Sequence, residues 1–215
     1  AGGSVKALLL ECLPLAVYAS LNTAIGSAPR YYCERLLGGE ALGCFNSVFV
    51  PVLVLQVGAV YLFVPFITRF SRLWSQKDRA GFWAGLRWLL SGLAVLWAAG
   101  AAGVALLGRW GLRLLYPARP EVWAWAGLLQ PLVFCCVLTV LATALCNLLI
   151  IARGMRGLIL GNLAGLCAAL ALSPVLIGRW GLYGAAYATM AGLAAQSACL
   201  FSSLLLRCKT QFAPG

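Results

Sequence analysis

Few residue types in this chain could take part in bond-making chemistry. The sequence contains no histidine, and its 5 acidic residues stand against 16 Lys and Arg, for a net charge of +11. Without histidine, neither a Ser-His nor a Cys-His nucleophile can form. The acids show no spaced motif of the kind that holds magnesium in lipid-linked phosphotransferases, so we expect no enzyme activity, no metal site and no cofactor. The acids are Glu11, Glu34, Glu40, Asp78 and Glu121.

The 9 cysteines do not point to redox or metal chemistry either. No Cys-x-x-Cys pair is present, and most of the cysteines lie inside long apolar stretches. A free cysteine in such surroundings behaves as a small hydrophobic residue. We therefore expect these residues to pack rather than to react; they are Cys12, Cys33, Cys44, Cys135, Cys136, Cys146, Cys167, Cys199 and Cys208.

The elements that must position the polar residues are apolar stretches too long for a soluble fold. The chain is 63% hydrophobic, and short Arg-bearing breaks divide it into long apolar segments. A helix needs roughly 20 apolar residues to cross a bilayer, and a barrel would show an alternating pattern that is absent here. The sequence predicts an all-α polytopic membrane protein with a single domain, 1–215. The expected spans are 6–28, 41–67, 82–108, 123–152, 158–177 and 182–206.

The break at 68–81 differs from the others in length and pattern. It alternates basic residues with Phe70, Leu73 and Trp74. Such a pattern is typical of an amphipathic helix that lies on a membrane surface. We expect this segment to be a surface helix on the cytoplasmic side.

The basic residues between the spans predict the orientation of the chain. Cytoplasmic loops carry the excess of Lys and Arg, so the richer side places both termini in the cytoplasm. This role accounts for the positive charge, and we expect no nucleic-acid partner. The richer side has Lys6, Arg69, Arg72, Lys77, Arg79, Arg153, Arg156, Arg207 and Lys209, with Arg87 just inside a span. The other side has Arg30, Arg35, Arg109, Arg113, Arg119 and Arg179.

Small residues recur at every fourth position in the last two spans. They are Gly157, Gly161, Gly165 and Ala169 in one span, and Gly184, Ala188 and Gly192 in the other. Such stripes allow helix backbones in a membrane to approach closely. We expect these two spans to pack on each other along the stripes, and a mobile, gliding interface is the alternative.

Three strings in this chain are similar to a known family. Residues 29–38 read PRYYCERLLG and are followed by EALG at 40–43; residues 181–189 read GLYGAAYAT. Together with the basic segment 66–83, they resemble the second half of bacterial polysaccharide flippases, of the O-antigen type. That family belongs to the multidrug/oligosaccharidyl-lipid/polysaccharide exporter superfamily, and the likeness covers nearly the whole chain.

The resemblance implies a six-helix lobe that faces a second lobe across a central cavity. It further implies transport of a lipid-linked oligosaccharide across the bacterial inner membrane by alternating access. Because family members have two lobes and the chain begins with Ala rather than Met, we expect a fragment or a processed chain. Its partner would be the missing N-terminal lobe or a second copy of itself, besides membrane lipid.

Arg30 and Arg35 are the candidate contacts for a diphosphate, because guanidinium pairs with phosphate oxygens in a bidentate way. The resemblance places basic residues of this helix toward the cavity. A purely structural role is the alternative, in which Arg30 pairs with Glu34 and Tyr31 stacks on Arg35, both at helical spacing.

The side-chain amides Asn22, Asn46 and Gln56 are the candidate contacts for sugar hydroxyls. They lie in the first two spans, which line the cavity in the family that the chain resembles. Hydrogen bonding between helices is the alternative role. Glu11, about one turn into the first span, either extends to the membrane surface or serves as an ion-coupling site.

Two other functions stay open at this point. A multidrug or metabolite extruder of the same superfamily would favour an acidic residue deep in the lobe, for which Glu11 is the one candidate. A truncated membrane protein that transports nothing is the other alternative. The sequence does not identify the sugar, the lipid or the coupling ion.

Overall fold

The computed structural model describes the backbone of residues 2–211 and the side chains of residues 13, 16–61, 63, 65–209 and 211. Within this part of the chain every regular element is helical and no strand is present. The elements are α1 (Gly2–Leu37), α2 (Gly39–Ser75), α3 (Arg79–Leu115), α4 (Pro120–Ala124), the 3-10 helix η1 (Ala126–Leu128), α5 (Leu129–Ile151), α6 (Met155–Trp180) and α7 (Leu182–Gln211). The predicted all-α class is confirmed.

Five helical segments are long and apolar enough to cross a membrane, among the residues that the structure describes. They are α2, α3, η1 with α5, α6, and α7 over Leu182–Lys209. This is compatible with a multi-pass membrane protein. The first predicted span, 6–28, is not among these five; it falls in α1, and its apolar first half lies largely outside the described side chains.

The segment 68–81 is not a separate surface helix. Helix α2 continues through it to Ser75, and α3 begins at Arg79 after a turn of three residues. The reason is local: Phe70 is buried against the neighbouring helices and Trp74 packs beside it, so burial rather than a surface position organises this stretch. Asp78 then caps α3 by accepting a hydrogen bond from the Gly81 amide at 2.9 Å.

Several other predicted boundaries differ as well. Helix α1 continues to Leu37 rather than ending at 28, and α2 continues to Ser75 rather than ending at 67. The fourth predicted span, 123–152, is divided, since α4 and η1 form a short irregular connection before α5 begins at Leu129. Helix α6 extends just under one turn beyond each end of 158–177, and α7 extends between one and two turns beyond 206.

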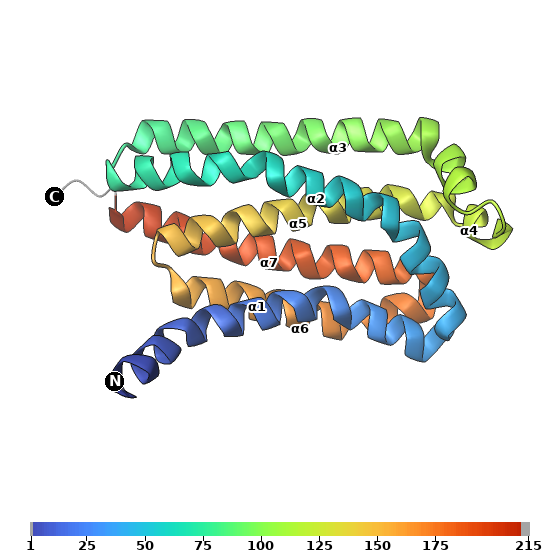
Figure 1. The fold of residues 1–215 in the computed structure, drawn as a ribbon, viewed down its shortest axis with the longest axis horizontal. Coiled ribbons are helices and arrows are strands. Elements are labelled where there is room, and N and C mark those ends of the chain that lie inside the picture. The colour runs from blue at the N-terminus through green and yellow to red at the C-terminus, as the bar shows by residue number, and fades with distance from the viewer. Residues whose placement is uncertain (1, 212–215) are drawn as a thin grey trace.

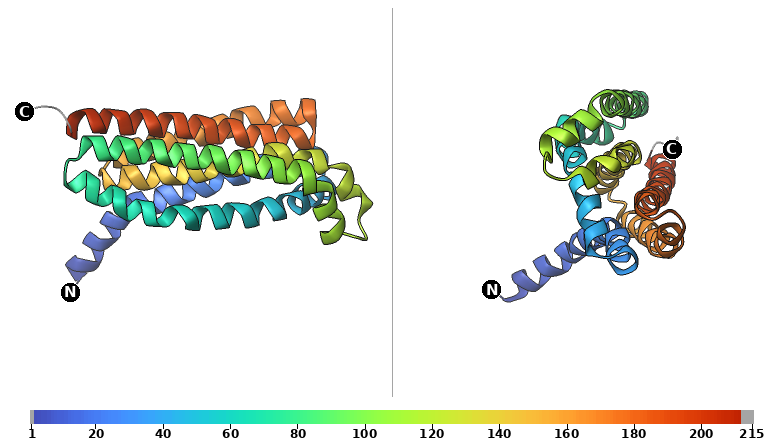
Figure 2. Two further views of the ribbon diagram at one scale, coloured as in Figure 1. Left: turned by 90° about the horizontal axis from the view of Figure 1, so that it is seen from above. Right: turned by 90° about the vertical axis from the view of Figure 1, so that its right-hand side faces the viewer.

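The long helices run side by side along the length of the molecule, as Figures 1 and 2 show. We call one end the N/C end; it holds both termini, the α2–α3 turn and the α5–α6 turn. The far end holds the α1–α2 turn, α4 with η1, and the α6–α7 turn. Helices α1 and α2 meet at the far end and separate toward the N/C end, with α5 and α7 visible between them in Figure 1.

The closest packing joins α6 to α7, along the two small-residue stripes. A Cβ atom built on Gly165 would lie 2.7 Å from Cβ of Gln196 and 3.0 Å from the carbonyl oxygen of Gly192. A Cβ atom on Gly192 would lie 2.9 Å from Cβ of Ala169. Only glycine fits such backbone approaches, and the predicted packing role of the stripes is confirmed.

Two large clusters of buried side chains form the core, each joining several helices. The cluster toward the N/C end includes Phe82, Leu89, Leu149 and Leu204. The cluster toward the far end includes Phe45, Leu112, Leu132, Ile177 and Leu182. Helices α2, α3, α5, α6 and α7 each contribute to both clusters, so the two clusters join the same helices at their two ends.

Candidate functional site

One face of α1 is exposed and polar along most of its described length. Ser20, Thr23, Ser27, Tyr31 and Glu34 follow one another at a spacing of three or four residues, and all five are exposed. This spacing places them in one stripe on the helix surface. We call these five residues the α1 polar stripe.

The exposed faces of α3 and α6 have a different composition. Apart from arginines toward their ends, the large side chains that these helices expose are aliphatic or Trp; they include Leu90, Val95, Trp97, Leu106, Leu107 and Leu114 on α3, and Leu160, Leu163, Leu170, Leu172 and Val175 on α6. Such faces suit contact with hydrocarbon, whereas ionisable and polar side chains in membrane helices face cavities or other protein. The exposed surface of the bundle is therefore polar along α1 and mainly apolar along α3 and α6.

Arg30 lies at the corner where α1 and α2 meet, next to the α1 polar stripe. It is part-buried, and its guanidinium carbon lies 4.9 Å from the centre of the Phe49 ring on α2. This is a cation–π contact between two helices. Every other described Lys and Arg side chain is exposed. Arg30 is therefore the least solvent-exposed of the described Lys and Arg side chains, and the ring contact fixes its position.

Two other predicted site residues, Asn46 and Arg35, lie near this corner. Asn46 is exposed on α2, about one helical turn before Phe49. Arg35 is exposed near the end of α1. Among the described side chains, no ion pair joins Arg30 to Glu34 and no cation–π contact joins Arg35 to Tyr31, so the two purely structural pairings are not formed.

A cluster of three side-chain amides joins α1, α6 and α7 near the middle of the bundle. The Nε2 group of Gln196 donates hydrogen bonds to Oδ1 of Asn162 at 2.8 Å and to Oδ1 of Asn22 at 3.2 Å. The Nδ2 group of Asn162 donates to the carbonyl oxygen of Leu158 at 2.8 Å. Asn162 and Gln196 are buried, whereas Asn22 is exposed, so the cluster connects the interior with the surface of α1.

The amide cluster is not saturated. The Oε1 atom of Gln196 and the hydroxyl of Ser197 are buried and have no hydrogen-bond partner among the described groups. Buried polar atoms in proteins are nearly always hydrogen-bonded. These two atoms are therefore exceptions within the described part of the bundle.

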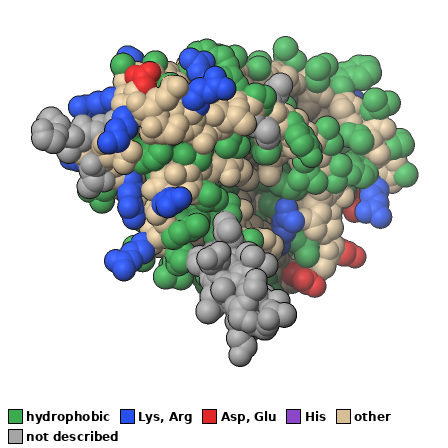
Figure 3. Space-filling model, turned by 60° about the vertical axis from the view of Figure 1, so that its left-hand side comes forward, with side chains coloured by type: hydrophobic (Ala, Val, Ile, Leu, Met, Phe, Trp, Pro, Cys, Tyr) green, Lys and Arg blue, Asp and Glu red, His purple; other side chains and the backbone are tan. Residues whose placement is uncertain are grey.

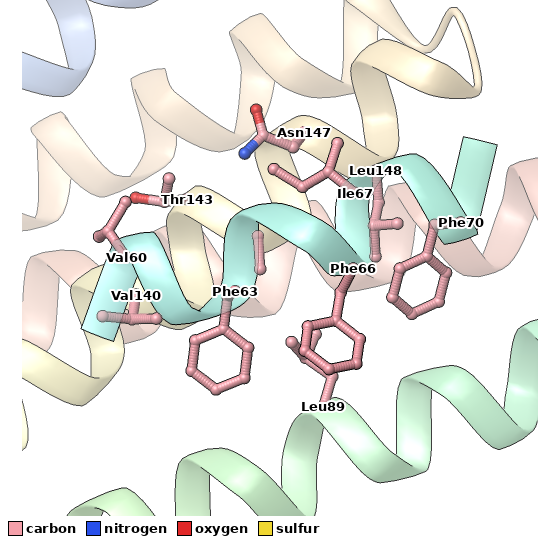
Figure 4. A pocket seen from close by; sticks show the side chains of 11 residues that line it. Val60, Phe63, Phe66, Ile67, Phe70, Leu89, Val140, Thr143, Asn147 and Leu148 are labelled. Carbon is pink, nitrogen blue, oxygen red and sulfur yellow. The ribbon is translucent and has the colours of Figure 1, made fainter. Parts of the chain in front are cut away.

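An apolar pocket of about 60 Å³ lies between α2, α3 and α5, toward the N/C end. Figure 4 shows Phe63, Phe66 and Leu89 on one side of α2, with Thr143 and Asn147 of α5 on the other. The pocket thus has an aromatic wall and a small polar rim. Its remaining lining residues are Val60, Ile67, Phe70, Val140, Ala144 and Leu148.

The predicted site residues do not form one compact site. Arg30 and Asn46 lie near the same corner, Asn22 joins the amide cluster, and Arg35 is at the far end. Gln56 is part-buried on α2, one turn before the pocket residue Val60. The side chain of Glu11 lies outside the described residues. The sequence-based set of site residues does not include Phe49, Asn162, Gln196 or Asn147.

Comparisons with known proteins give no identification. No protein-family model, no curated protein and no solved structure matches the chain.

Proposed function

We propose that the chain is one lobe of a membrane transporter that moves a lipid-linked oligosaccharide across the bacterial inner membrane by alternating access. The observation that supports this most is the α1 polar stripe, with part-buried Arg30 beside it, on a bundle whose α3 and α6 faces are apolar. A polar helix face with a fixed cation is unfavourable in hydrocarbon. It suits a water-filled path shared with a second lobe.

The chemistry of the substrate class fits several separate features of the bundle. Arg30 supplies a cation for the diphosphate. The exposed amides of Asn22 and Asn46 can exchange hydrogen bonds with sugar hydroxyls. The apolar pocket between α2, α3 and α5 provides an apolar flank for part of the lipid tail. No bond is made or broken in this process, in keeping with the lack of histidine.

An extruder of drugs or metabolites is the second candidate within transport. It would favour an acidic residue within the span region of the lobe. The four acids whose side chains the structure describes are all exposed and lie near helix ends; they are Glu34, Glu40, Asp78 and Glu121. Glu11 stays the one candidate for that role, and its side chain lies outside the described residues.

Transport by this lobe requires a second helical lobe. Alternating access in transporters of this kind comes from the rocking of one bundle against another around a central site. The α1 polar stripe and Asn46 would otherwise face lipid. We therefore expect the lobe to function with an N-terminal lobe or with a second copy of itself.

Reconstitution of the purified chain into vesicles tests the proposal. The vesicles contain a fluorescent polyprenyl-diphosphate oligosaccharide, and its movement between leaflets is followed by an impermeant quencher. We expect no flipping by the chain as a monomer, and flipping when a first lobe is co-reconstituted or when crosslinking shows a homodimer.

Two further arms of the same experiment separate the alternatives. A fluorescent phospholipid of matched size serves as the substrate control, and a fluorescent cationic drug tests the extruder. Efflux of the drug without flipping of the sugar lipid would favour the extruder. Flipping by a demonstrated monomer would contradict the half-transporter proposal, and no transport in any arm would leave only the non-transporting alternative.

A further inference from the structure

The two ends of the bundle carry very different charge. Nine described basic side chains lie at or near the N/C end, where Asp78 is the one described acid. They come from α2, the α2–α3 turn, α3, the α5–α6 turn, α6 and α7, and are Arg69, Arg72, Lys77, Arg79, Arg87, Arg153, Arg156, Arg207 and Lys209. The far end has six basic residues against three acids. In Figure 3, where the N/C end comes forward, Lys and Arg side chains are spread over it.

Two of these basic residues occupy backbone positions that favour glycine. Lys77 and Arg153 have φ angles of 55° and 50°, the left-handed region, and they are the two non-glycine residues with positive φ in the described chain. Side chains in this region cost roughly 1 kcal/mol or more relative to glycine. At the far end, the corresponding α1–α2 and α6–α7 turns have glycine at positive φ, Gly38 and Gly181.

The two turns share one hydrogen-bond pattern. The amide of Asp78 donates to the carbonyl of Leu73 at 3.1 Å, and the amide of Gly154 donates to the carbonyl of Leu149 at 2.8 Å. Each bond closes the end of a helix around a residue in the left-handed region, a position that is usually Gly and sometimes Asn. A basic residue near a helix C-terminus is favourable in itself, but that benefit does not require this strained position.

The two turns also lie close to the end of α7. The Nε atom of Arg207 would be 3.7 Å from a Cβ atom built on Gly154, next to Arg153. Three segments that are far apart in the sequence therefore present basic side chains on one surface. Aromatic residues of the kind found at membrane interfaces, Trp74, Trp83 and Trp88, lie in the helices just behind the α2–α3 turn.

We propose that the N/C end is a binding surface for anionic phospholipid headgroups, with Lys77 and Arg153 as its principal contacts. The partner follows from charge: basic residues next to a membrane attract anionic lipids. It also follows from place, because these turns join helices that are apolar enough to span a membrane and so lie at headgroup level. The proposal does not depend on the transported substrate and holds for any function of the bundle.

The test compares lipid binding and stability in the same variants of the full chain. Purified protein is titrated with phosphatidylglycerol and, separately, with phosphatidylcholine, and bound lipids are counted by native mass spectrometry. We expect Lys77→Gly with Arg153→Gly to weaken phosphatidylglycerol binding by about tenfold or more, with little change for phosphatidylcholine. The double variant should unfold at a temperature no lower than that of the original protein, because glycine adopts positive φ angles without steric strain.

Matched controls make the outcome specific. Lys77→Asn with Arg153→Asn removes the charges while keeping a residue that tolerates the left-handed region, and it should lose binding equally. Arg109→Gln with Arg119→Gln removes the same charge at the far end and should keep it. Unchanged phosphatidylglycerol binding in the Gly and Asn variants would overturn the proposal, as would an equal loss in the far-end variant. If the partner of this surface is an acidic protein rather than lipid, phosphatidylglycerol binding will be unchanged in the Gly and Asn variants.

Discussion

Arg30 differs from the other Lys and Arg residues whose side chains the structure describes, because it alone is part-buried. Its guanidinium lies over the Phe49 ring, 4.9 Å from the ring centre. This contact fixes the cation between α1 and α2 while leaving its hydrogen-bond donors for another partner, because a cation–π contact uses the face of the group. A diphosphate is the partner that the proposed function supplies.

We predict that Arg30→Gln reduces the flipping rate roughly ten- to a hundredfold in the assembled transporter. Loss of a charged hydrogen bond costs about 1.5–3 kcal/mol, and one factor of ten corresponds to about 1.4 kcal/mol. Arg30→Lys should fall in between, because a point charge lacks the planar fork. The rate is measured in the vesicle assay at equal protein density.

Arg113→Gln provides the matched control for this prediction. Arg113 lies over Trp123 in a similar contact, 5.6 Å from the ring centre, but on α3 rather than α1. Arg113→Gln should leave the rate within about twofold of the original protein. Equal losses in the two variants would show that the contact is structural, and no loss in Arg30→Gln would place the phosphate site elsewhere.

The residues of the candidate site are predictable only in part. A polar side chain inside an apolar segment is visible in the sequence, and Asn22 and Arg30 stand out on that ground. Their partners do not, because Asn22 meets a residue 174 positions away and Gln196 meets one 34 positions away. Which amides meet depends on how α1 crosses the α6–α7 pair. Phe49 carries no polar signal and acquires its role only through the position of Arg30.

At the scale of the helices, the sequence predicts which segments are helical more readily than it predicts where each helix begins and ends. Hydrophobic stretches with few breaks indicate the long helices, and the stripes at every fourth residue indicate the α6–α7 contact. Boundaries differ because an apolar stretch stops at the first basic residues, whereas the helix continues beyond them; the second apolar stretch stops at 67, but α2 continues to Ser75. The basic pattern at 68–75 is that of a surface helix, but burial of Phe70 keeps that segment in α2.

We predict opposite effects of the same substitution at two glycines of α6. Gly165→Ala would bring a methyl group against Gln196 and the backbone oxygen of Gly192, at 2.7 and 3.0 Å. It should lower the free energy of unfolding by about 1–3 kcal/mol. A Cβ atom built on Gly178 has no neighbour within 4 Å. Gly178→Ala should therefore be neutral, or stabilising by up to about 1 kcal/mol.

Equilibrium unfolding in mixed detergent micelles measures both variants against the original chain. Because both substitutions are Gly→Ala in one helix, differences in helix propensity cancel between them. A loss of stability in Gly178→Ala as large as in Gly165→Ala would show that backbone flexibility, rather than close packing against α7, determines the role of these glycines.

At the scale of the whole molecule, the central feature is the difference between its exposed faces. Helix α1 presents the polar stripe, whereas α3 and α6 present aliphatic side chains. Polar residues within α1 are visible in the sequence, but only the fold shows that five of them share one exposed face. A free-standing bundle in lipid gains nothing from such a face, and a lobe that borders a water-filled path requires one.

Cysteine accessibility tests this central claim most directly. In a background without other cysteines, Ser27→Cys places a thiol on the α1 polar stripe, and the native Cys167 is exposed among the leucines of α6. Both are labelled in intact membranes, with a second lobe present, by a membrane-impermeant maleimide and then by a membrane-permeant one. We predict that the impermeant reagent modifies the thiol introduced on α1 but not Cys167, and that the permeant reagent modifies both. Modification of Cys167 but not of the introduced thiol by the impermeant reagent would contradict the account, because α1 would then face lipid and α6 would face water.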